Sequence, residues 1–242
     1  MKIGEKALTD QDLWHTEEWV SQARKLIRWI KGVDEDKPLM ILVRHSHRET
    51  LRNHEDMLSS GLTPLGKAVS KEMGRRIPTH RKAHFFFSIV PRCFETAEAI
   101  SEGFNEVGGE VIDMDPLPTL VGPEYTDNSV WMNLNPNGEN VTAFVNRWAS
   151  GEFEGRIESF NKFQERLMDD TLRRFSSLKE NHVHIHITHD LALMSAKRVL
   201  SGRKLTEEDR EPYLGGIAIA LKNSNYRIFM TGESEELKPK LL

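Results

Sequence analysis

The sequence contains a single cysteine, no long apolar run and no large excess of either charge. Cys93 is the only cysteine among 242 residues, so no disulfide can form within the chain, and such a chain suits a reducing cytoplasm. The first residues lack the apolar stretch of a secretory signal, and no apolar run approaches membrane-spanning length. We therefore expect a cytoplasmic protein that does not insert into a membrane.

The formal net charge is only −4, which argues against nucleic acid or an acidic membrane surface as a partner. Hydrophobic residues make up 38% and charged residues 29% of the chain, a balance typical of a folded globular protein. Any strongly positive site must therefore be local and built from a few residues.

Apolar runs typical of buried strands alternate with segments of helical spacing. We expect strands at residues 39–43, 85–88, 111–114 and 182–188, and a hairpin of 215–221 and 226–230 with its turn at 223–225. We expect helices at residues 10–31, 64–76, 91–102, 141–149, 157–179 and 191–200. Strands that alternate with helices predict an α/β fold, here a three-layer α/β/α sandwich with a mainly parallel sheet.

The chain is expected to divide into an N-terminal helical extension, residues 1–37, and a catalytic domain, residues 38–242. Within the second part, residues of about 101–180 are expected to form a helical cap insertion. Residues 115–139 are rich in Pro, Gly and Asn, which is typical of a long functional loop. Residues 233–238 are expected to be a solvated end.

Polar residues follow three of the expected strands where each strand ends: Arg44, His45 and Arg48, then Arg92, then His189 and Asp190. In open α/β sheets, ligands bind beyond the carboxyl ends of the strands. Clustered arginines repel one another unless an anion lies between them, and a phosphate dianion matches guanidinium groups well. A neutral imidazole can attack phosphorus to give a phosphohistidine, and a carboxylic acid can protonate the leaving oxygen. The pattern predicts phosphoryl transfer with His45 as nucleophile and Asp190 as acid.

Four motifs in chain order resemble those of the histidine phosphatase superfamily, which includes phosphoglycerate-mutase-like enzymes and histidine acid phosphatases. They are 44–48 (RHSHR), 63–66 (TPLG), 91–97 (PRCFETA) and 189–190 (HD). The resemblance runs from about residue 39 to residue 230 and leaves out the N-terminal helix. It implies a phosphorylated His45, phosphate ligands at Arg44 and Arg92, and a second imidazole, His189, at the phosphate. Arg48 and Asp190 match the second arginine and the proton donor of the acid-phosphatase branch.

The sequence departs from the family pattern at two places. Ser46 stands where the family has a glycine after the nucleophile, which raises the question of backbone strain. The mutase-like branch carries its acid on a glutamate in the third-strand loop, where this chain has Thr119, with Glu124 nearby. We therefore favour Asp190 as the acid and keep Glu124 as a reserve in the substrate pocket.

These observations favour a metal-independent phosphomonoester phosphatase that needs no cofactor. Its substrate would be a phosphorylated small molecule or a phosphoprotein. The sequence leaves undecided whether the chain forms a homodimer. Two alternatives on the same fold are a phosphoglycerate-mutase-type phosphotransferase and a catalytically weak regulatory protein that binds a phosphate ligand. A third is a zinc hydrolase, because His182, His184 and His186 alternate along one strand face.

Several residues have two interpretations that the sequence cannot separate. Tyr125 and Trp131, in the 115–139 loop, could contact substrate or anchor the loop. His47 could face the site or solvent. Cys93 is expected to be a buried packing residue and not a nucleophile.

Overall fold

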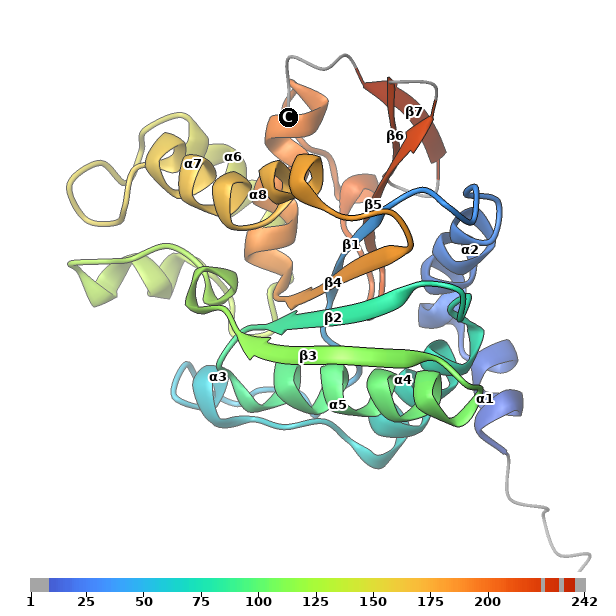
Figure 1. The fold of residues 1–242 in the computed structure, drawn as a ribbon. Coiled ribbons are helices and arrows are strands. Elements are labelled where there is room, and N and C mark those ends of the chain that lie inside the picture. The colour runs from blue at the N-terminus through green and yellow to red at the C-terminus, as the bar shows by residue number, and fades with distance from the viewer. Residues whose placement is uncertain (1–8, 223–224, 231–232, 238–242) are drawn as a thin grey trace, which may run out of the picture.

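The computed structural model describes residues 9–222, 225–230 and 233–237, which form one seven-stranded sheet with helices on both faces (Figure 1). The strands follow the spatial order β3-β2-β4-β1-β5-β6-β7. The first four in this order are parallel, and the last three continue the sheet in antiparallel fashion. The strands are β1 (Leu39–Arg44), β2 (Lys82–Phe87), β3 (Glu110–Pro116), β4 (His182–Thr188), β5 (Gly216–Lys222), β6 (Asn225–Met230) and β7 (Glu233–Leu237). The expected α/β fold class is confirmed.

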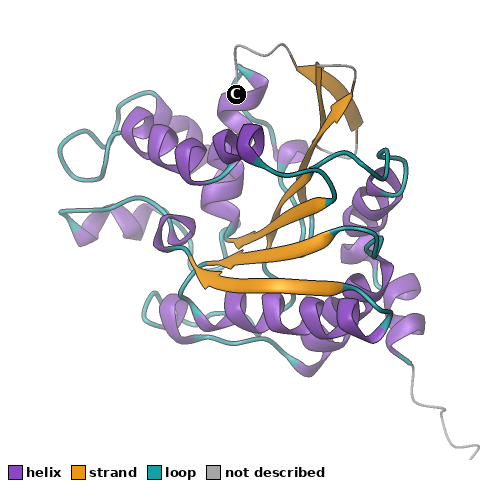
Figure 2. Cartoon of the chain, viewed as in Figure 1, coloured by secondary structure: helices purple, strands orange, loops and turns teal. Residues whose placement is uncertain are grey.

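Helices cover both faces of the sheet, as Figure 2 shows. One face lies under α2 (Ser21–Ile30), α4 (Pro64–Arg76) and α5 (Pro91–Glu106), which share a core with alternate side chains of β1. The other face lies under α6 (Val141–Ala149), α7 (Phe160–Asp170) and α8 (Asp190–Ser201), which share a core with the intervening β1 side chains. All six residues of β1 are buried, as expected of a strand covered on both faces.

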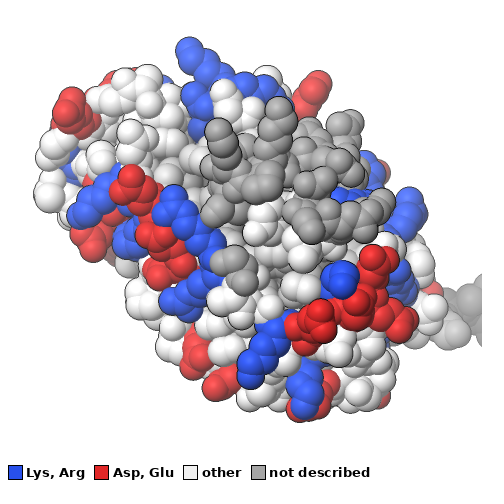
Figure 3. All heavy atoms as spheres, turned by 45° about the horizontal axis from the view of Figure 1, so that its top comes forward, with Lys and Arg blue, Asp and Glu red and all other residues white. Residues whose placement is uncertain are grey.

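The remaining helical segments are short. They are α1 (Asp10–Thr16), α3 (Asp56–Ser59) and the 3₁₀ helices η1 (Glu18–Val20), η2 (Pro118–Val121), η3 (Asn128–Asn133), η4 (Leu172–Ser177) and η5 (Glu207–Asp209). No helix in these described parts of the chain is long and apolar enough to cross a membrane. On the face drawn in Figure 3, acidic and basic side chains are interspersed, in keeping with the small net charge.

Local sequence explains why α4 and α5 begin and pack where they do. Thr63 caps α4 through its side chain, which accepts from the Gly66 N–H, and Pro64 takes the first helical position. The two helices pack closely at Gly74 and Gly103, where a Cβ would lie 2.0 Å and 1.9 Å from backbone carbonyl oxygens of the partner helix. Glycine at these two positions therefore brings α5, which carries Arg92, close against α4.

Two expected helices are shorter in the structure than the sequence predicted. The first is broken into α1, η1 and α2, because Glu17 has extended backbone (φ −69°, ψ 120°). The guanidinium of Arg24 stabilises the break by donating to the carbonyl oxygens of Trp14 (2.7 Å) and Glu17 (3.2 Å). The helix expected at 157–179 ends at Asp170, and a 3₁₀ segment follows. An apolar stripe at helical spacing does not reveal either break.

The last strand of the sheet in chain order also differs from the expectation. Residues 233–237 form β7, which pairs with β6, whereas the sequence predicted a solvated end. Their polar, glutamate-rich composition is unusual for a strand. The hairpin of β5 and β6 is confirmed, while residues 223 and 224 of its turn and residue 238 lie outside the described residues.

Candidate active site

The ends of β1, β2 and β4 meet because these strands are neighbours in the order β2-β4-β1. Arg44 pairs in register with Thr188, so His45 and His189 follow side by side on adjoining strand ends. Their ring centroids lie 5.4 Å apart. The backbone N–H of His45 donates to the Thr188 carbonyl at 2.8 Å, which fixes this end of β1 against β4. The structure thus brings together the two histidines that the sequence singled out.

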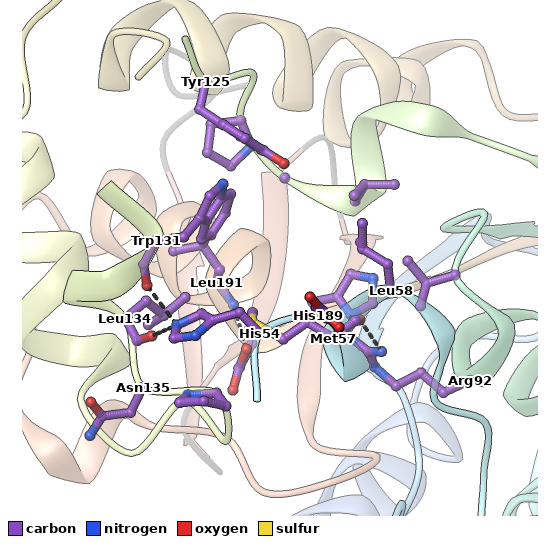
Figure 4. A pocket seen from close by; sticks show the side chains of 18 of the residues that line it. His54, Met57, Leu58, Arg92, Tyr125, Trp131, Leu134, Asn135, His189 and Leu191 are labelled. Atoms are coloured by element: carbon purple, nitrogen blue, oxygen red, sulfur yellow. Dashed lines mark hydrogen bonds between the residues drawn. The ribbon is translucent and has the colours of Figure 1, made fainter. Parts of the chain in front are cut away.

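Arg92 lies between the two imidazoles. It is the second residue of α5, which begins soon after β2 ends. Its Nε donates to His45 Nε2 at 3.0 Å, and its Nη2 donates to His189 Nδ1 at 3.0 Å. The third nitrogen, Nη1, donates to the Met57 carbonyl at 2.5 Å. Figure 4 shows this guanidinium next to His189 at the inner end of a pocket.

These contacts assign the protons of both imidazoles. His45 Nδ1 lies 2.8 Å from the Ser46 carbonyl, which can only accept, so Nδ1 carries the proton and Nε2 has the lone pair. In His189, Nδ1 accepts from Arg92, so Nε2 carries the proton and donates to Ser88 Oγ at 2.8 Å. Burial, followed by the positive charge of Arg92, lowers the pKa of His45 well below 6.5. The same two causes lower the pKa of His189. Both rings are therefore neutral near pH 7.

Arg44 does not line the pocket, although it is buried next to His45. Its Nη2 forms an ion pair with Asp190 Oδ2 at 3.1 Å, and its Nη1 donates to the Glu211 carbonyl at 3.1 Å. The other oxygen of Asp190 accepts the Leu191 N–H at 2.9 Å. In this structure Arg44 orients the carboxylate, whereas the sequence placed it directly on a phosphate.

Residues 211–213, far along the chain from Arg44, contact its guanidinium group. The Arg44 Cζ lies 4.5 Å from the centroid of the Tyr213 ring, a cation–π contact. The neighbouring Glu211 forms a buried ion pair with Lys197, with Nζ and Oε1 2.8 Å apart. Because Lys197 belongs to α8, this pair ties the segment to the helix that carries Asp190. Removing one partner of such a buried pair typically costs about 3–5 kcal/mol of stability.

His47 faces away from the pocket and joins an aromatic cluster. Its Nδ1 lies 2.8 Å from Thr63 Oγ1, and its ring lies 5.4 Å from that of Tyr213 and 5.7 Å from that of Trp19. Trp19 also meets the Tyr213 ring edge-on at 5.8 Å. Trp19 therefore contacts the aromatic ring that stacks on Arg44, so the segment around Trp19 adjoins the site.

Ser46 is accommodated without backbone strain. Among the described non-glycine residues, only Asn181 and Leu214 have a positive φ. The Ser46 N–H donates to Thr96 Oγ1 at 3.0 Å, and its Oγ donates to the Gly66 carbonyl at 2.9 Å. Serine in place of the family glycine thus ties the loop that carries His45 to α4 and α5.

Five of the seven site residues expected from the sequence line one cavity of about 490 Å³: His45, Arg48, Arg92, His189 and Asp190. Arg48 is held by the Glu49 carbonyl and by Asn137 Oδ1, at 2.8 and 3.0 Å from its Nη1. Burial lowers the pKa of Arg48, and burial lowers that of Arg92 to about 10. Both guanidinium groups therefore remain positively charged at neutral pH.

Glu124 is not among the residues that line the cavity, although Pro123 and Tyr125 on either side of it are. Its side chain is exposed, and its backbone pairs with Glu158, whose N–H donates to the Glu124 carbonyl at 2.6 Å. Glu124 therefore does not line the cavity, and its role as reserve acid stays a prediction without support from this geometry. Glu55, just before α3, is the second carboxylate that lines the cavity.

The sequence also missed Ser88 and Tyr213, which hold His189 and Arg44. Ser88 carried a usable signal, since it is polar and directly follows β2. Glu55 and Tyr213 carried none, because their sequence neighbours match no recognisable motif. Cys93 is buried, and burial raises the pKa of its thiol to about 12, which argues against a nucleophilic role, as expected.

Potential metal ligands converge elsewhere in the described residues. His182, His184 and His186 belong to β4, and burial lowers the pKa of His184 to about 4 and that of His186 to about 3. The group whose ligand atoms lie within 4.8 Å of one another is instead His84, Asp113 and Asp115. None of these residues lines the cavity at His45. The three-histidine zinc site expected as an alternative therefore gains no support from the geometry.

Comparison with known proteins agrees with this architecture. The family model described as "Histidine phosphatase superfamily (branch 1)" matches residues 40–215. Among solved structures, YhfR of Bacillus stearothermophilus superposes with a TM-score of 0.55 and 19% identity, covering 81% of this chain and 97% of that one. A phosphoglycerate mutase from Bacillus anthracis str. Sterne gives 0.54 and 13%, covering 83% and 95%. A comparison with curated protein sequences found no match.

The fold is the phosphoglycerate-mutase-like α/β architecture, and the candidate site lies where β1, β2 and β4 end. Because the matching model spans most of the chain, the chain belongs to branch 1 of the histidine phosphatase superfamily. Solved structures with this fold include this phosphoglycerate mutase and a protein described as a "putative alpha-ribazole-5'-P phosphatase" from Escherichia coli. The sequence relates Arg48 and Asp190 to the acid-phosphatase branch, and both residues line the cavity of this branch 1 member.

Proposed function

We propose that this chain hydrolyses phosphomonoesters through a covalent phosphohistidine at His45, without a metal ion. The observation that carries the proposal is the state of the His45 ring. Its Nδ1 is bound by the Ser46 carbonyl, and its neutral Nε2 lies on the cavity side, 3.0 Å from Arg92 Nε. A neutral imidazole whose Nε2 lone pair accepts from a guanidinium can attack a bound phosphate once that guanidinium turns to the phosphate oxygens.

In the first step, the Nε2 lone pair attacks phosphorus, and the ester P–O bond breaks with its electrons leaving on the alcohol oxygen. Arg48 and Arg92 would stabilise the charge on the equatorial oxygens, while His189, whose Nδ1 accepts from Arg92, would orient that guanidinium. In the second step, water attacks the phosphohistidine and the P–N bond breaks. This step returns the Nε2 lone pair and releases inorganic phosphate.

The alcohol oxygen needs a proton as it leaves, and we propose that Asp190, protonated beside the bound phosphate dianion, is the donor. Its carboxyl group lines the cavity and is held by Arg44 and the Leu191 N–H. In the second step the same group would take a proton from the attacking water, which restores the starting state. Glu55 is the other carboxylate that lines the cavity and is therefore the alternative donor.

A hydrolase is favoured over a phosphoglycerate-mutase-type enzyme by the charges in the cavity. A mutase must hold its released monophosphate, whose carboxylate needs a cationic partner. Beyond the residues at the phosphate end, Glu55 is the one charged side chain among the described residues that line the cavity. An acidic side chain there would repel a carboxylate, so the product is expected to leave.

The function is tested by turnover of p-nitrophenyl phosphate. We expect His45→Ala to reduce kcat by about a thousandfold or more, because the nucleophile is lost, while the melting temperature shows a folded protein. His182→Ala, which removes a partly exposed histidine of β4 outside the cavity, serves as the matched control and should retain activity. Saturating chelator should leave wild-type turnover unchanged. Turnover that survives in His45→Ala, or that is lost with chelator, would contradict the proposal.

The donor is tested by the dependence on the leaving group. We expect Asp190→Asn to lower kcat/KM by about 10²–10⁴-fold for an alkyl phosphate, whose alkoxide needs a proton. The loss should be much smaller for p-nitrophenyl phosphate, whose phenolate leaves unaided. Glu55→Gln should show no such difference between the two substrates. If Glu55→Gln shows it and Asp190→Asn does not, the donor is Glu55.

A further inference from the structure

The cavity at His45 has most of its charged side chains at one end, and its other polar side chains, His54, Glu55, Asn128 and Asn135, lie among apolar ones. His45, Arg92, His189 and Asp190 lie at this inner end, whereas the outer walls are formed mainly by apolar side chains of α3 and of residues 121–136. Figure 4 shows Met57 and Leu58 on one side of the cavity, and Tyr125, Trp131 and Leu134 around the rest. Its volume of about 490 Å³ falls within the range of pockets that bury a whole small molecule.

Three of the wall residues expose large apolar side chains to solvent. Leu58 is 61% exposed, Met132 is 71% exposed and Tyr125 is 43% exposed. All three line this cavity, and they come from two segments far apart in the sequence. A contiguous apolar surface of this kind is unfavourable in water and marks a binding site.

The apolar wall is held in place before any ligand arrives. His54 Nε2 lies 2.9 Å from the Trp131 carbonyl and 3.0 Å from the Leu134 carbonyl, which ties the two wall segments together. The Trp131 ring stacks on Phe144 in the core, with an interplanar angle of 4°, and meets Tyr125 edge-on at 5.0 Å. Trp131 and Tyr125 thus anchor the loop and also line the cavity, while their contact with substrate stays a prediction.

Polar substrates find few partners in this outer part. Glu55 is its one charged side chain within the described residues, and it would repel a second phosphate or a carboxylate. Glu55, Asn128 and Asn135 are the polar side chains that a sugar could meet there, whereas hydroxyl groups placed against Leu58, Met132 and Trp131 would lose water without a hydrogen bond in return.

We propose that the outer cavity is a subsite for a large apolar alcohol, so that the substrates are monophosphates of long-chain alkyl or aromatic alcohols. This inference rests on the proposed function for the chemistry at His45, but the subsite itself can be tested by binding alone. Each methylene that leaves water for the apolar wall strengthens binding by about threefold. Specificity then arises from burial of the alcohol, while the phosphate fixes its position.

The test uses n-alkyl monophosphates from ethyl to octyl, whose alcohols have nearly the same leaving-group strength. We expect kcat/KM to rise with chain length and to be several hundredfold higher for octyl than for ethyl phosphate, about threefold for each of the six added methylenes. Propyl phosphate should exceed glycerol 3-phosphate, which has the same carbon skeleton with two added hydroxyl groups. An octyl-to-ethyl ratio near one overturns the inference, as does preferred turnover of glycerol 3-phosphate or of phosphopeptides.

Variants of the wall residues test whether these residues cause the dependence of kcat/KM on chain length. Leu58→Gln and Met132→Gln should each lower the octyl-to-ethyl ratio by about threefold or more, because a polar amide replaces apolar surface. Ile112→Gln is the matched control, since Ile112 is 48% exposed on β3 and does not line the cavity. This variant should keep the wild-type ratio. An equal change in all three variants would assign the effect to surface polarity in general and overturn the subsite.

Calorimetry tests the subsite independently of the proposed function. It compares the binding of ethylphosphonate with that of octylphosphonate. Tighter binding of octylphosphonate to wild type and to His45→Ala supports the apolar subsite even if no ester is hydrolysed, in which case only the proposed function fails. Equal binding of the two phosphonates, together with His45-dependent turnover of ethyl phosphate, overturns the subsite and leaves the proposed function standing.

Discussion

Gly138 faces the carboxylate of Asp190 and has a φ of +70°. A Cβ at this position would lie 2.3 Å from Asp190 Oδ2, the oxygen that pairs with Arg44. Any side chain here must therefore displace the carboxylate or move the loop. Glycine at this position allows the 134–140 loop to lie against the proposed proton donor.

We predict that Gly138→Ala lowers kcat/KM for an alkyl phosphate by about tenfold or more, because Asp190 loses its position next to Arg44. Alanine at a positive φ also costs about 1–2 kcal/mol of stability. Gly151→Ala is a matched control: its φ is +85°, and its Cβ would meet no atom within 4 Å. Melting temperatures and turnover of both variants separate the two effects. Similar stability losses with an activity loss in Gly138→Ala alone support the account, and equal activity losses contradict it.

At the scale of single elements, the buried His186 of β4 should make the free energy of unfolding depend on pH. His186 is fully buried in β4, stacks on Phe86 with centroids 4.8 Å apart, and has no hydrogen-bond partner for Nε2. Burial lowers its pKa from 6.5 to about 3. In the unfolded chain the same imidazole takes up a proton near pH 6.5. The unfolded state therefore binds more protons between these two values.

The free energy of unfolding should consequently fall as the pH falls below 6.5, and this one imidazole should contribute about 1.4 kcal/mol per pH unit down to about pH 3. We predict that His186→Leu, which cannot be protonated, reduces that slope by about this amount in urea unfolding at pH 6, 5 and 4. His182→Leu, at the partly exposed start of the same strand, should leave the slope close to that of wild type. An unchanged slope in His186→Leu would contradict the assignment.

At the scale of the whole molecule, the sequence predicted the fold class and most of the elements. Strand β4 has the expected bounds, because a β-branched and apolar alternation in an interior strand is a clear signal. The helix breaks after Thr16 and Asp170 were not predicted, since they depend on contacts such as that of Arg24 with distant carbonyl groups. The polar strand β7 was missed for the same reason: its partner strand, not its composition, makes it a strand.

The sequence likewise predicted some features of the site and missed others. His45, Arg92 and His189 could be predicted to converge, because each follows a strand end and parallel neighbouring strands end at one edge. The orientation of Arg44 could not be predicted. Its partners are the Glu211 carbonyl, 167 residues further along the chain, and the ring of Tyr213. The division into residues 1–37 and 38–242, with a cap from about 101–180, stays a prediction, although α2 shares its core with the sheet.

The central claim is that residue 45 carries the phosphoryl group during turnover. It is tested most directly by mixing the protein with p-nitrophenyl phosphate, quenching in alkaline denaturant within milliseconds, and mapping the added phosphoryl mass by peptide mass spectrometry. We predict one phosphoryl group on the His45 ring in wild type, more of it in Asp190→Asn if hydrolysis of the intermediate is slowed, and none in His45→Ala. A phosphoryl group on another residue, or steady turnover with no trapped adduct and with unchanged rate in His45→Ala, would contradict the account.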